Sequence, residues 1–216
     1  MTTTEKVLYT IKADPHPVLA FSNLIEPRQY KGKGKFQYDA RLVFTSATHP
    51  DVVRVKELAA QVASTTFPAA PLGQFILPWK TGEQMVAEAA EGVARGNKPL
   101  KPEEWLGTFN IAVRSEYQPE FGMIENNRLV KFEGQSAALA EKHIYSGQHV
   151  GGTVEIVAYF VDGRYYIKLY PKDIVSFGGG QRRGGSSTMT ESYSEYTGHA
   201  TAFDPTAGLV SGNTPW

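Results

Sequence analysis

The sequence predicts a mainly β protein, folded as one small barrel of five or six strands with one main helix. Three observations lead to this prediction. They are a β-hairpin signal at residues 153–170, a series of short strand-like segments before it, and one helical pattern that begins at Pro50. The composition is that of a globular chain, because 41% of the 216 residues are hydrophobic and 12% are aromatic. This length is sufficient for one good hydrophobic core.

The hairpin signal is the segment TVEIVAYFVDGRYYIKLY, in which Asp162-Gly163 joins two alternating runs. An Asp-Gly pair favours a two-residue turn, which fixes the register and sets Tyr159 opposite Tyr166. Because side chains alternate along a strand, one face is expected in the core and the other in solvent. The core face collects Val154, Ile156, Ala158, Phe160, Tyr165, Ile167 and Leu169, and the solvent face collects Glu155, Val157, Tyr159, Tyr166, Lys168 and Tyr170.

The solvent face of this hairpin is a candidate binding surface. Three tyrosines and Lys168 would form a platform on which flat rings could stack. A purely structural interpretation stands beside this one, since tyrosine is common in strands and exposed cross-strand aromatic pairs stabilise hairpins without binding anything.

A basic loop at residues 28–41, RQYKGKGKFQYDAR, is the second candidate surface. It follows a strand predicted at 18–25 and leads into a second strand that ends at Phe44. Five basic residues face one acidic residue, Asp39, which gives a net charge of +4, and aromatic residues lie between them. Cations for phosphates and rings for bases are what binding of single-stranded nucleic acid requires. A solvated flexible loop is the alternative, and the strand parity that Tyr38 shares with Leu42 also fits a core position.

The remaining elements complete the fold prediction. A helix from Pro50 has apolar residues at helical spacing and should cover the core. A Pro-rich loop at 67–78, a short acidic helix at 83–92 and an extended segment at 98–105 follow, and strands are predicted at 107–114, 128–132 and 174–177. Two strands around a basic loop, a helix, a long excursion and further strands describe an OB-fold, with an SH3-like barrel or a split sandwich as alternatives.

The composition changes at Gly178, and the rest of the chain is rich in Gly, Ser and Thr without periodicity. We therefore expect a folded domain at residues 1–177 and a flexible, disordered tail at 178–216. The tail ends in Pro215-Trp216, and proline before a terminal indole would present a stiffened hook to a partner protein. A plain solubilising tail is the alternative.

Several classes of function find no support in the sequence. Lys+Arg and Asp+Glu both number 22, so a nucleic-acid role would have to depend on local basic patches. The chain has no cysteine, which suits a reducing compartment, and its five histidines have no metal-ligand spacing. We find neither a nucleotide-binding loop, a nucleophile elbow nor a signal-peptide pattern. We expect a non-enzymatic protein without metal or cofactor, located in the cytoplasm, which is the host cytoplasm if the protein is viral.

The chain contains five short motifs, which are Asn23-Leu-Ile-Glu-Pro27, Phe36-Gln-Tyr-Asp-Ala-Arg-Leu-Val-Phe44, Tyr145-Ser-Gly147 with Val150, Ala158-Tyr159-Phe160 with Gly163, and Lys172-Asp-Ile174. Taken together in their order and spacing, they resemble the OB-fold single-stranded-DNA-binding (helix-destabilising) proteins of tailed bacteriophages. The resemblance covers about residues 18–185 and implies a DNA replication and recombination protein that coats and protects single strands. Members of that family tend to have an acidic tail with a terminal aromatic residue. This tail has few acidic residues, although it does end in Trp216.

The sequence therefore predicts a sequence-tolerant binder of single-stranded DNA that also contacts replication proteins through its tail and assembles as a homo-oligomer or cooperatively on DNA. A virion structural or decoration protein and an accessory domain that binds RNA or double-stranded DNA remain as alternatives. Trp79 and Trp105 are candidates on loops, although tryptophan is more often a core residue. The predicted DNA-binding residues are Tyr30, Lys31, Lys33, Lys35, Phe36, Tyr38, Arg41, Trp79, Lys80, Arg114, Tyr159, Tyr166, Lys168, Tyr170, Arg182 and Arg183, and the predicted partner-binding residue is Trp216.

Overall fold

The computed structural model describes residues 5–29, 34–96 and 99–181. The chain divides into two units, residues 1–183 and 184–216, and the description below concerns the first. Of the predicted disordered tail, residues 182–216 lie outside the described residues, as do the site candidates Tyr30, Lys31, Lys33, Arg182, Arg183 and Trp216. The first tail residues are ordered, because Gly178 belongs to a strand and the N–H of Gly180 donates a hydrogen bond to Gln148 Oε1.

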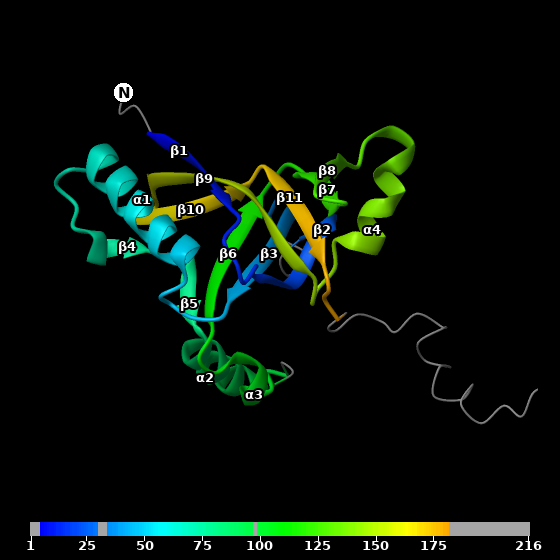
Figure 1. Ribbon diagram of the computed structural model, residues 1–216. Helices are drawn as coiled ribbons and strands as arrows, with labels where there is room; N and C mark the ends of the chain where they lie inside the picture. Colours follow the sequence, from blue (N-terminus) through cyan, green and yellow to red (C-terminus); the bar gives the residue numbers. More distant parts are fainter. Residues whose placement is uncertain (1–4, 30–33, 97–98, 182–216) are drawn as a thin grey trace, which may run out of the picture. The chain divides into compact units, whose positions relative to one another are not determined.

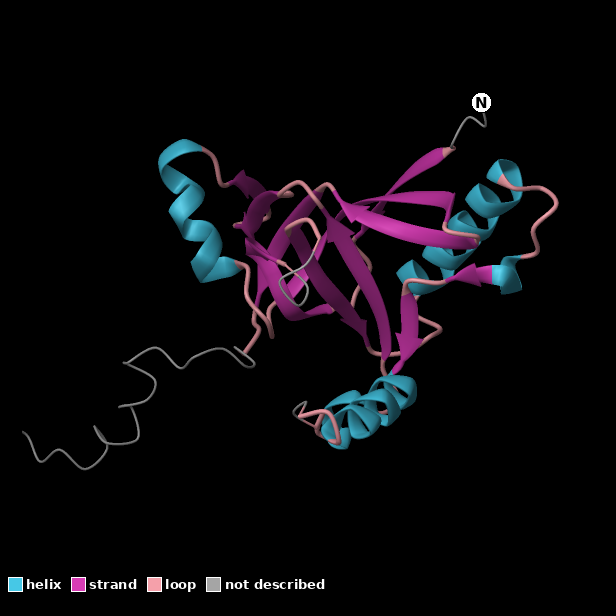
Figure 2. Ribbon diagram, turned by 180° about the vertical axis from the view of Figure 1, so that it is seen from behind, coloured by secondary structure: helices cyan, strands magenta, loops and turns pink. Residues whose placement is uncertain are grey.

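The prediction of a mainly β fold is confirmed, because eleven strands in the described ranges form one hydrogen-bonded sheet (Figure 1). The strands are β1 (Lys6–Ile11), β2 (Val18–Arg28), β3 (Gln37–Phe44), β4 (Phe75–Ile76), β5 (Trp79–Thr81), β6 (Phe109–Ser115), β7 (Glu120–Glu125), β8 (Arg128–Lys131), β9 (His149–Val161), β10 (Arg164–Pro171) and β11 (Asp173–Gly178). The helices are α1 (Pro50–Thr66), η2 (Leu72–Gln74), α2 (Gly82–Val93), α3 (Pro102–Trp105), η3 (Gly134–Leu139) and α4 (Ala140–His143). Figure 2 shows that these helices lie around the outside of the strands.

The strands run in the order β5-β6-β3-β2-β9-β11-β7-β8, while β1 and β10 also pair with β9 and β4 pairs with β10. Strands β6, β3, β2, β9 and β10 thus run around the core. β10 also lies alongside β6, but no ladder pairs these two strands in the part of the chain that the structure describes. The sheet is therefore not closed into a barrel, and it contains more strands than the five or six that we predicted.

Strand β9 pairs with four other strands. Its first residues pair with β2 and β11, and its later residues pair with β1 and β10. Two glycines lie where the pairing changes. A Cβ atom on Gly151 would lie 2.5 Å from the carbonyl oxygen of Ile11, and one on Gly152 would lie 2.2 Å from that of Asp173. Gly152 also has a φ of +134°, a backbone conformation that other residues rarely adopt. Glycine is thus required for β9 to pass between its neighbours.

The predicted hairpin register is confirmed at every pair from Val161↔Arg164 to Glu155↔Tyr170. Asp162 and Gly163 have φ values of 51° and 75°, as a type I′ turn requires. Two side chains differ from the prediction. Phe160, expected in the core, is 51% exposed, because it lies next to the turn, where the hairpin extends past the core. Val157, expected in solvent, is buried, since Lys6 of β1 and Lys168 of β10 flank it on both sides.

Helix α1 covers the core as predicted and is bound to a strand that the sequence analysis missed. Its apolar positions Val52, Val55, Leu58, Ala59 and Val62 are buried. At its first turn the buried carboxylate of Asp51 accepts hydrogen bonds from Tyr9 Oη, at 2.6 Å, and from the backbone N–H groups of Lys12 and Ala13. These bonds attach α1 to β1 and to the residues that follow it. No helix in the described ranges is long and apolar enough to cross a membrane.

The excursion between α1 and β6 forms a second, small apolar cluster on the outer side of β2 and β3. The predicted acidic helix is confirmed as α2, but the segment predicted to be extended ends in the helical turn α3. Proline at the first position and two glutamates in the first turn favour such a helix start. Trp105, at the end of α3, is buried among Ala20, Val43 and Met85 and is therefore not a loop residue.

The crowding around Gly152 gives a test of this fold. Gly152→Ala should lower the free energy of unfolding by about 3 kcal/mol, as expected for a severe backbone clash. Gly163→Ala is the matched control, because Gly163 also has a positive φ, but a Cβ atom added there would meet no other part of the described chain within 4 Å. Gly163→Ala should lower the free energy of unfolding by only about 1 kcal/mol. Urea unfolding measures both values, and equal losses would contradict the packing described for β9.

Candidate nucleic-acid interface

The solvent side of the β9–β10 hairpin has the aromatic platform that its alternation predicts. The rings of Tyr159 and Tyr166 are stacked, with centroids 5.2 Å apart and an interplanar angle of 10°. The Nζ atom of Lys168 lies 4.6 Å from the centroid of the Tyr170 ring. All four side chains are partly exposed. We call these four residues the tyrosine face.

A cleft of about 530 Å³ borders the tyrosine face on the side of the loop that follows β6. This volume is in the range of small-molecule binding sites. Tyr117, which the sequence analysis did not single out, stands at this cleft and is 81% exposed. The cleft therefore has tyrosine rings from two separate segments. Its lining residues are Lys6, Ser115, Glu116, Tyr117, Gln118, Glu155, Val157, Tyr159, Tyr170, Pro171 and Lys172.

Charged groups around the cleft form ion pairs. Lys35 donates to Glu116 over 2.7 Å, and this hydrogen bond raises the pKa of the lysine. Lys172 lies 2.8 Å from Glu155 and lowers the pKa of that carboxyl group. The two carboxylates at the rim are therefore neutralised by lysines, so the cleft carries little net charge of its own.

Burial changes the titration of the tyrosine face. Burial, together with the neighbouring rings, raises the pKa of Tyr159, and burial followed by the charge of Glu116 raises that of Tyr170. Burial lowers the pKa of Lys168, and the positive charge of Arg114 lowers it further. Tyr159 and Tyr170 thus stay neutral at physiological pH, and Arg114 on β6 is close enough to act on β10 across the open seam of the sheet.

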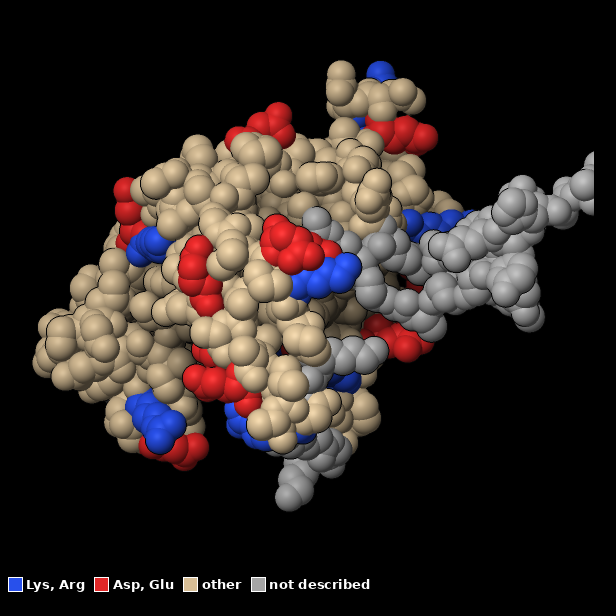
Figure 3. Space-filling view, turned by 90° about the horizontal axis from the view of Figure 1, so that it is seen from below, with Lys and Arg blue, Asp and Glu red and all other residues tan. Residues whose placement is uncertain are grey.

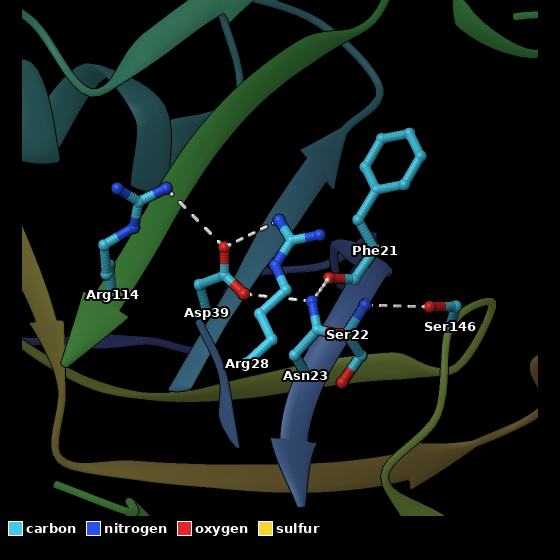
Figure 4. A network of polar contacts seen from close by, with 7 residues as sticks. All are labelled: Phe21, Ser22, Asn23, Arg28, Asp39, Arg114 and Ser146. Carbon is cyan, nitrogen blue, oxygen red and sulfur yellow. Dashed lines mark hydrogen bonds and ion pairs between the residues drawn. The ribbon is translucent and has the colours of Figure 1, made fainter. Parts of the chain in front are cut away.

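Arg114 also belongs to a polar network on the outer side of β2, β3 and β6, which Figure 4 shows. The largely buried carboxylate of Asp39 lies 3.6 Å from Arg114 and 3.0 Å from Arg28, and it accepts a hydrogen bond of 2.9 Å from Asn23. Both arginine side chains are more than half exposed. Asp39 therefore fixes two accessible guanidinium groups next to each other. We call Arg28, Asp39 and Arg114 the arginine pair network.

The other predicted residues of the basic loop and of β3 have mixed positions. Phe36 is 60% exposed and remains available for stacking, and Lys35 is exposed although it is paired. Tyr38 is half-buried and packs against the core, as its strand parity with Leu42 suggested. Arg41 lies on the outer side of β3, but burial lowers its pKa, and its Nη1 atom is buried without an acceptor in the described part of the chain.

Trp79 and Lys80 are not on a loop. Both belong to β5, which pairs with β6, and Trp79 packs against the main core. Lys80 forms an ion pair with Glu88 of α2. These contacts give both residues structural roles, and their contact with DNA stays a prediction.

Charges are mixed in sign on the face of the molecule that Figure 3 shows. In Figure 3, basic and acidic side chains lie next to one another and do not gather into one large basic area. Within the described ranges, no group of three or more His, Asp or Glu side chains could hold a metal ion. The arrangement thus offers stacking rings with a few cations, and it resembles neither a metal centre nor a broadly basic surface.

Solved structures of a bacteriophage protein are similar to this one. The single-stranded DNA-binding protein from bacteriophage Enc34, in complex with ssDNA, has a TM-score of 0.57 and 14% identity, over 83% of this chain and 89% of that one. A second structure of the Enc34 protein has a TM-score of 0.54 and 14% identity, over 88% of this chain and 89% of that one.

This chain shares the fold of the Enc34 protein. The predicted resemblance to phage single-stranded-DNA-binding proteins is therefore confirmed at the level of the fold. No family model matches the chain, and no curated protein matches it in sequence.

Proposed function

We propose that this protein binds single-stranded DNA through the tyrosine face, the adjoining cleft and the arginine pair network. The observation that carries the proposal is the stacked pair Tyr159–Tyr166 beside Lys168 and Arg114, on a fold shared with the Enc34 protein, of which one structure is a complex with ssDNA. Stacking rings next to cations are the two components that sequence-tolerant binding of single strands needs.

The two components would act on different parts of a nucleotide. Bases would stack on the tyrosine rings, and the cleft at Tyr117 would accept a base turned away from the strand. Phosphates would contact Lys168, which lies over the Tyr170 ring, Arg114, which acts on Lys168, and Arg28, which shares the carboxylate of Asp39 with Arg114. Guanidinium groups suit phosphate oxygens, since they offer several donors in a fixed plane.

The mixed surface charge is consistent with binding that depends more on stacking than on electrostatic attraction. With about three phosphate contacts, the logarithm of the binding constant should fall with the logarithm of salt concentration with a slope of about −2, at about −0.7 per contact. We further infer a non-enzymatic role in phage DNA replication and recombination, in the cytoplasm of the host cell. Contacts of the tail with replication proteins and assembly on DNA are parts of the same proposal.

Two other functions would use the same fold differently. A virion structural or decoration protein would not need stacked tyrosines beside a lysine and an accessible arginine. An accessory domain for RNA or double-stranded DNA would read a duplex mainly through its phosphates, whereas Lys35 and Lys172 beside the tyrosine face are paired with glutamates.

A titration of the protein with oligo-dT, followed by its tyrosine and tryptophan fluorescence at several salt concentrations, tests the proposal. We expect a dissociation constant between about nanomolar and about micromolar and the shallow salt slope given above. Duplex DNA and RNA of equal length should compete with labelled oligo-dT more weakly than unlabelled oligo-dT does. No binding of oligo-dT at low salt would reject the proposal, and stronger competition by duplex or RNA would favour the accessory domain.

The stacking component has its own test in Tyr166. Replacement of Tyr166 by Ala should cost about 1–3 kcal/mol of binding free energy for oligo-dT, because a base would lose its stacking partner. The free energy of unfolding should fall by less than about 1 kcal/mol, because only one cross-strand pair on a partly exposed face is lost. Tyr166→Phe is the matched control and should bind like the wild type. A loss of stability with unchanged affinity would leave the tyrosines with a structural role alone.

The lowered pKa of Lys168 predicts a pH dependence of binding. A phosphate would favour the charged amine, whereas burial in the free protein favours the neutral one. Protonation of Lys168 is thus linked to binding, and affinity should fall as the pH rises toward the usual lysine value of about 10.4. Lys168→Arg keeps its charge over this range and should remove most of that dependence. If both proteins respond to pH equally, Lys168 does not contact a phosphate.

A further inference from the structure

Phe21 lies in a strained part of β2, on the same outer side of the sheet as the arginine pair network. Its φ is 50°, a conformation that is rare for a residue with a bulky side chain. The register explains why. Ala20 pairs with Arg41 and Asn23 pairs with Asp39, so three steps along β2 match two along β3, as in a β-bulge. The extra residue reverses the alternation, and Leu19 and Leu24 are therefore both buried while Phe21 turns outward.

Hydrogen bonds around the bulge hold this conformation. Asn23 Nδ2 donates to the carbonyl oxygen of Phe21 at 3.1 Å and also to Asp39. The N–H of Ser22 donates to Ser146 Oγ at 3.0 Å (Figure 4). The side-chain amide of Asn23 thus contacts both the strained residue Phe21 and the carboxylate of Asp39, which fixes the two arginines. Strained residues that are held in place in this way occur mainly at functional sites.

The ring of Phe21 is stacked on one side and accessible on the other. It lies parallel to the indole of Trp105, with centroids 5.3 Å apart and an interplanar angle of 14°. Trp105 is 6% exposed, whereas Phe21 is 44% exposed. The indole therefore supports one face of the phenyl ring, and the other side of the ring remains available to a flat ligand.

We propose that Phe21 is a base-stacking residue and forms a second stacking position on the path of the same DNA strand. This inference rests on the proposed function. Arg28 and Arg114 would hold the phosphates between the two positions, because Asp39 links them to the bulge and Arg114 acts on the tyrosine face. A strand that crosses the outer side of the sheet would thus meet rings, then guanidinium groups, then the Phe21 ring.

The length of the DNA gives a specific signature for this path. An oligo-dT of about 4 nucleotides should occupy one position, and one of about 16 nucleotides should reach both. For the longer strand, Phe21→Ala should bind about 5- to 150-fold more weakly than the wild type, which corresponds to the loss of one stacked base. The same oligonucleotides should bind Phe21→Tyr, which keeps the ring, as they bind the wild type. Fluorescence anisotropy of labelled oligonucleotides measures these affinities.

Two further variants separate binding from folding. Phe21→Gly allows the positive φ without strain, so it should be at least as stable as Phe21→Ala and should still lose affinity for the longer strand. Phe160→Ala removes a phenyl ring of similar exposure at the hairpin turn, outside the arginine pair network, and should leave the affinity unchanged. If the wild type binds the long strand and the Ala and Gly variants at Phe21 bind it equally well, the inference is wrong and Phe21 merely covers Trp105. If the wild type binds neither strand, the proposed function itself fails.

Discussion

The structure depends on the passage of β9 between four neighbouring strands. The strand must change partners in mid-course, and this change brings its backbone against the carbonyl oxygens of Ile11 and Asp173, where side chains do not fit. Glycines at 151 and 152 meet this requirement. Because the strand continues into the hairpin, the same passage also sets the position of Tyr159 and of the tyrosines opposite and beside it on β10.

A second constraint is the carboxylate of Asp39, which organises the outer side of the sheet. It is held beneath two exposed guanidinium groups and shares the amide of Asn23 with the bulge at Phe21. The chain has equal numbers of acidic and basic residues, and Lys35 and Lys172 near the candidate site are paired with glutamates. These lysines therefore add little attraction for a polyanion. On this account a few fixed arginines supply the electrostatic attraction, and neutral rings supply most of the affinity.

Local patterns in the sequence were sufficient for the hairpin and for α1. The Asp162-Gly163 turn fixes every pair of the hairpin, and helical spacing identifies the buried side of α1. Features that depend on distant partners could not be predicted in this way. The burial of Val157 follows from pairing with β1. The outward position of Phe21 follows from a β-bulge, which the pattern of apolar residues in β2 does not indicate. Trp105 looked like a loop residue because its partners Ala20 and Val43 lie far away in the sequence.

Photo-cross-linking of single-stranded DNA that contains 5-iodouracil, followed by mass spectrometry of the peptides, tests the central claim most directly. The account predicts cross-links to Tyr159, Tyr166 or Tyr170 on the tyrosine face, and fewer of them when unlabelled single strands compete. Cross-links confined to β7 and β8, at one end of the strand order, or to the helix α4 would contradict the account even if the protein binds single-stranded DNA tightly.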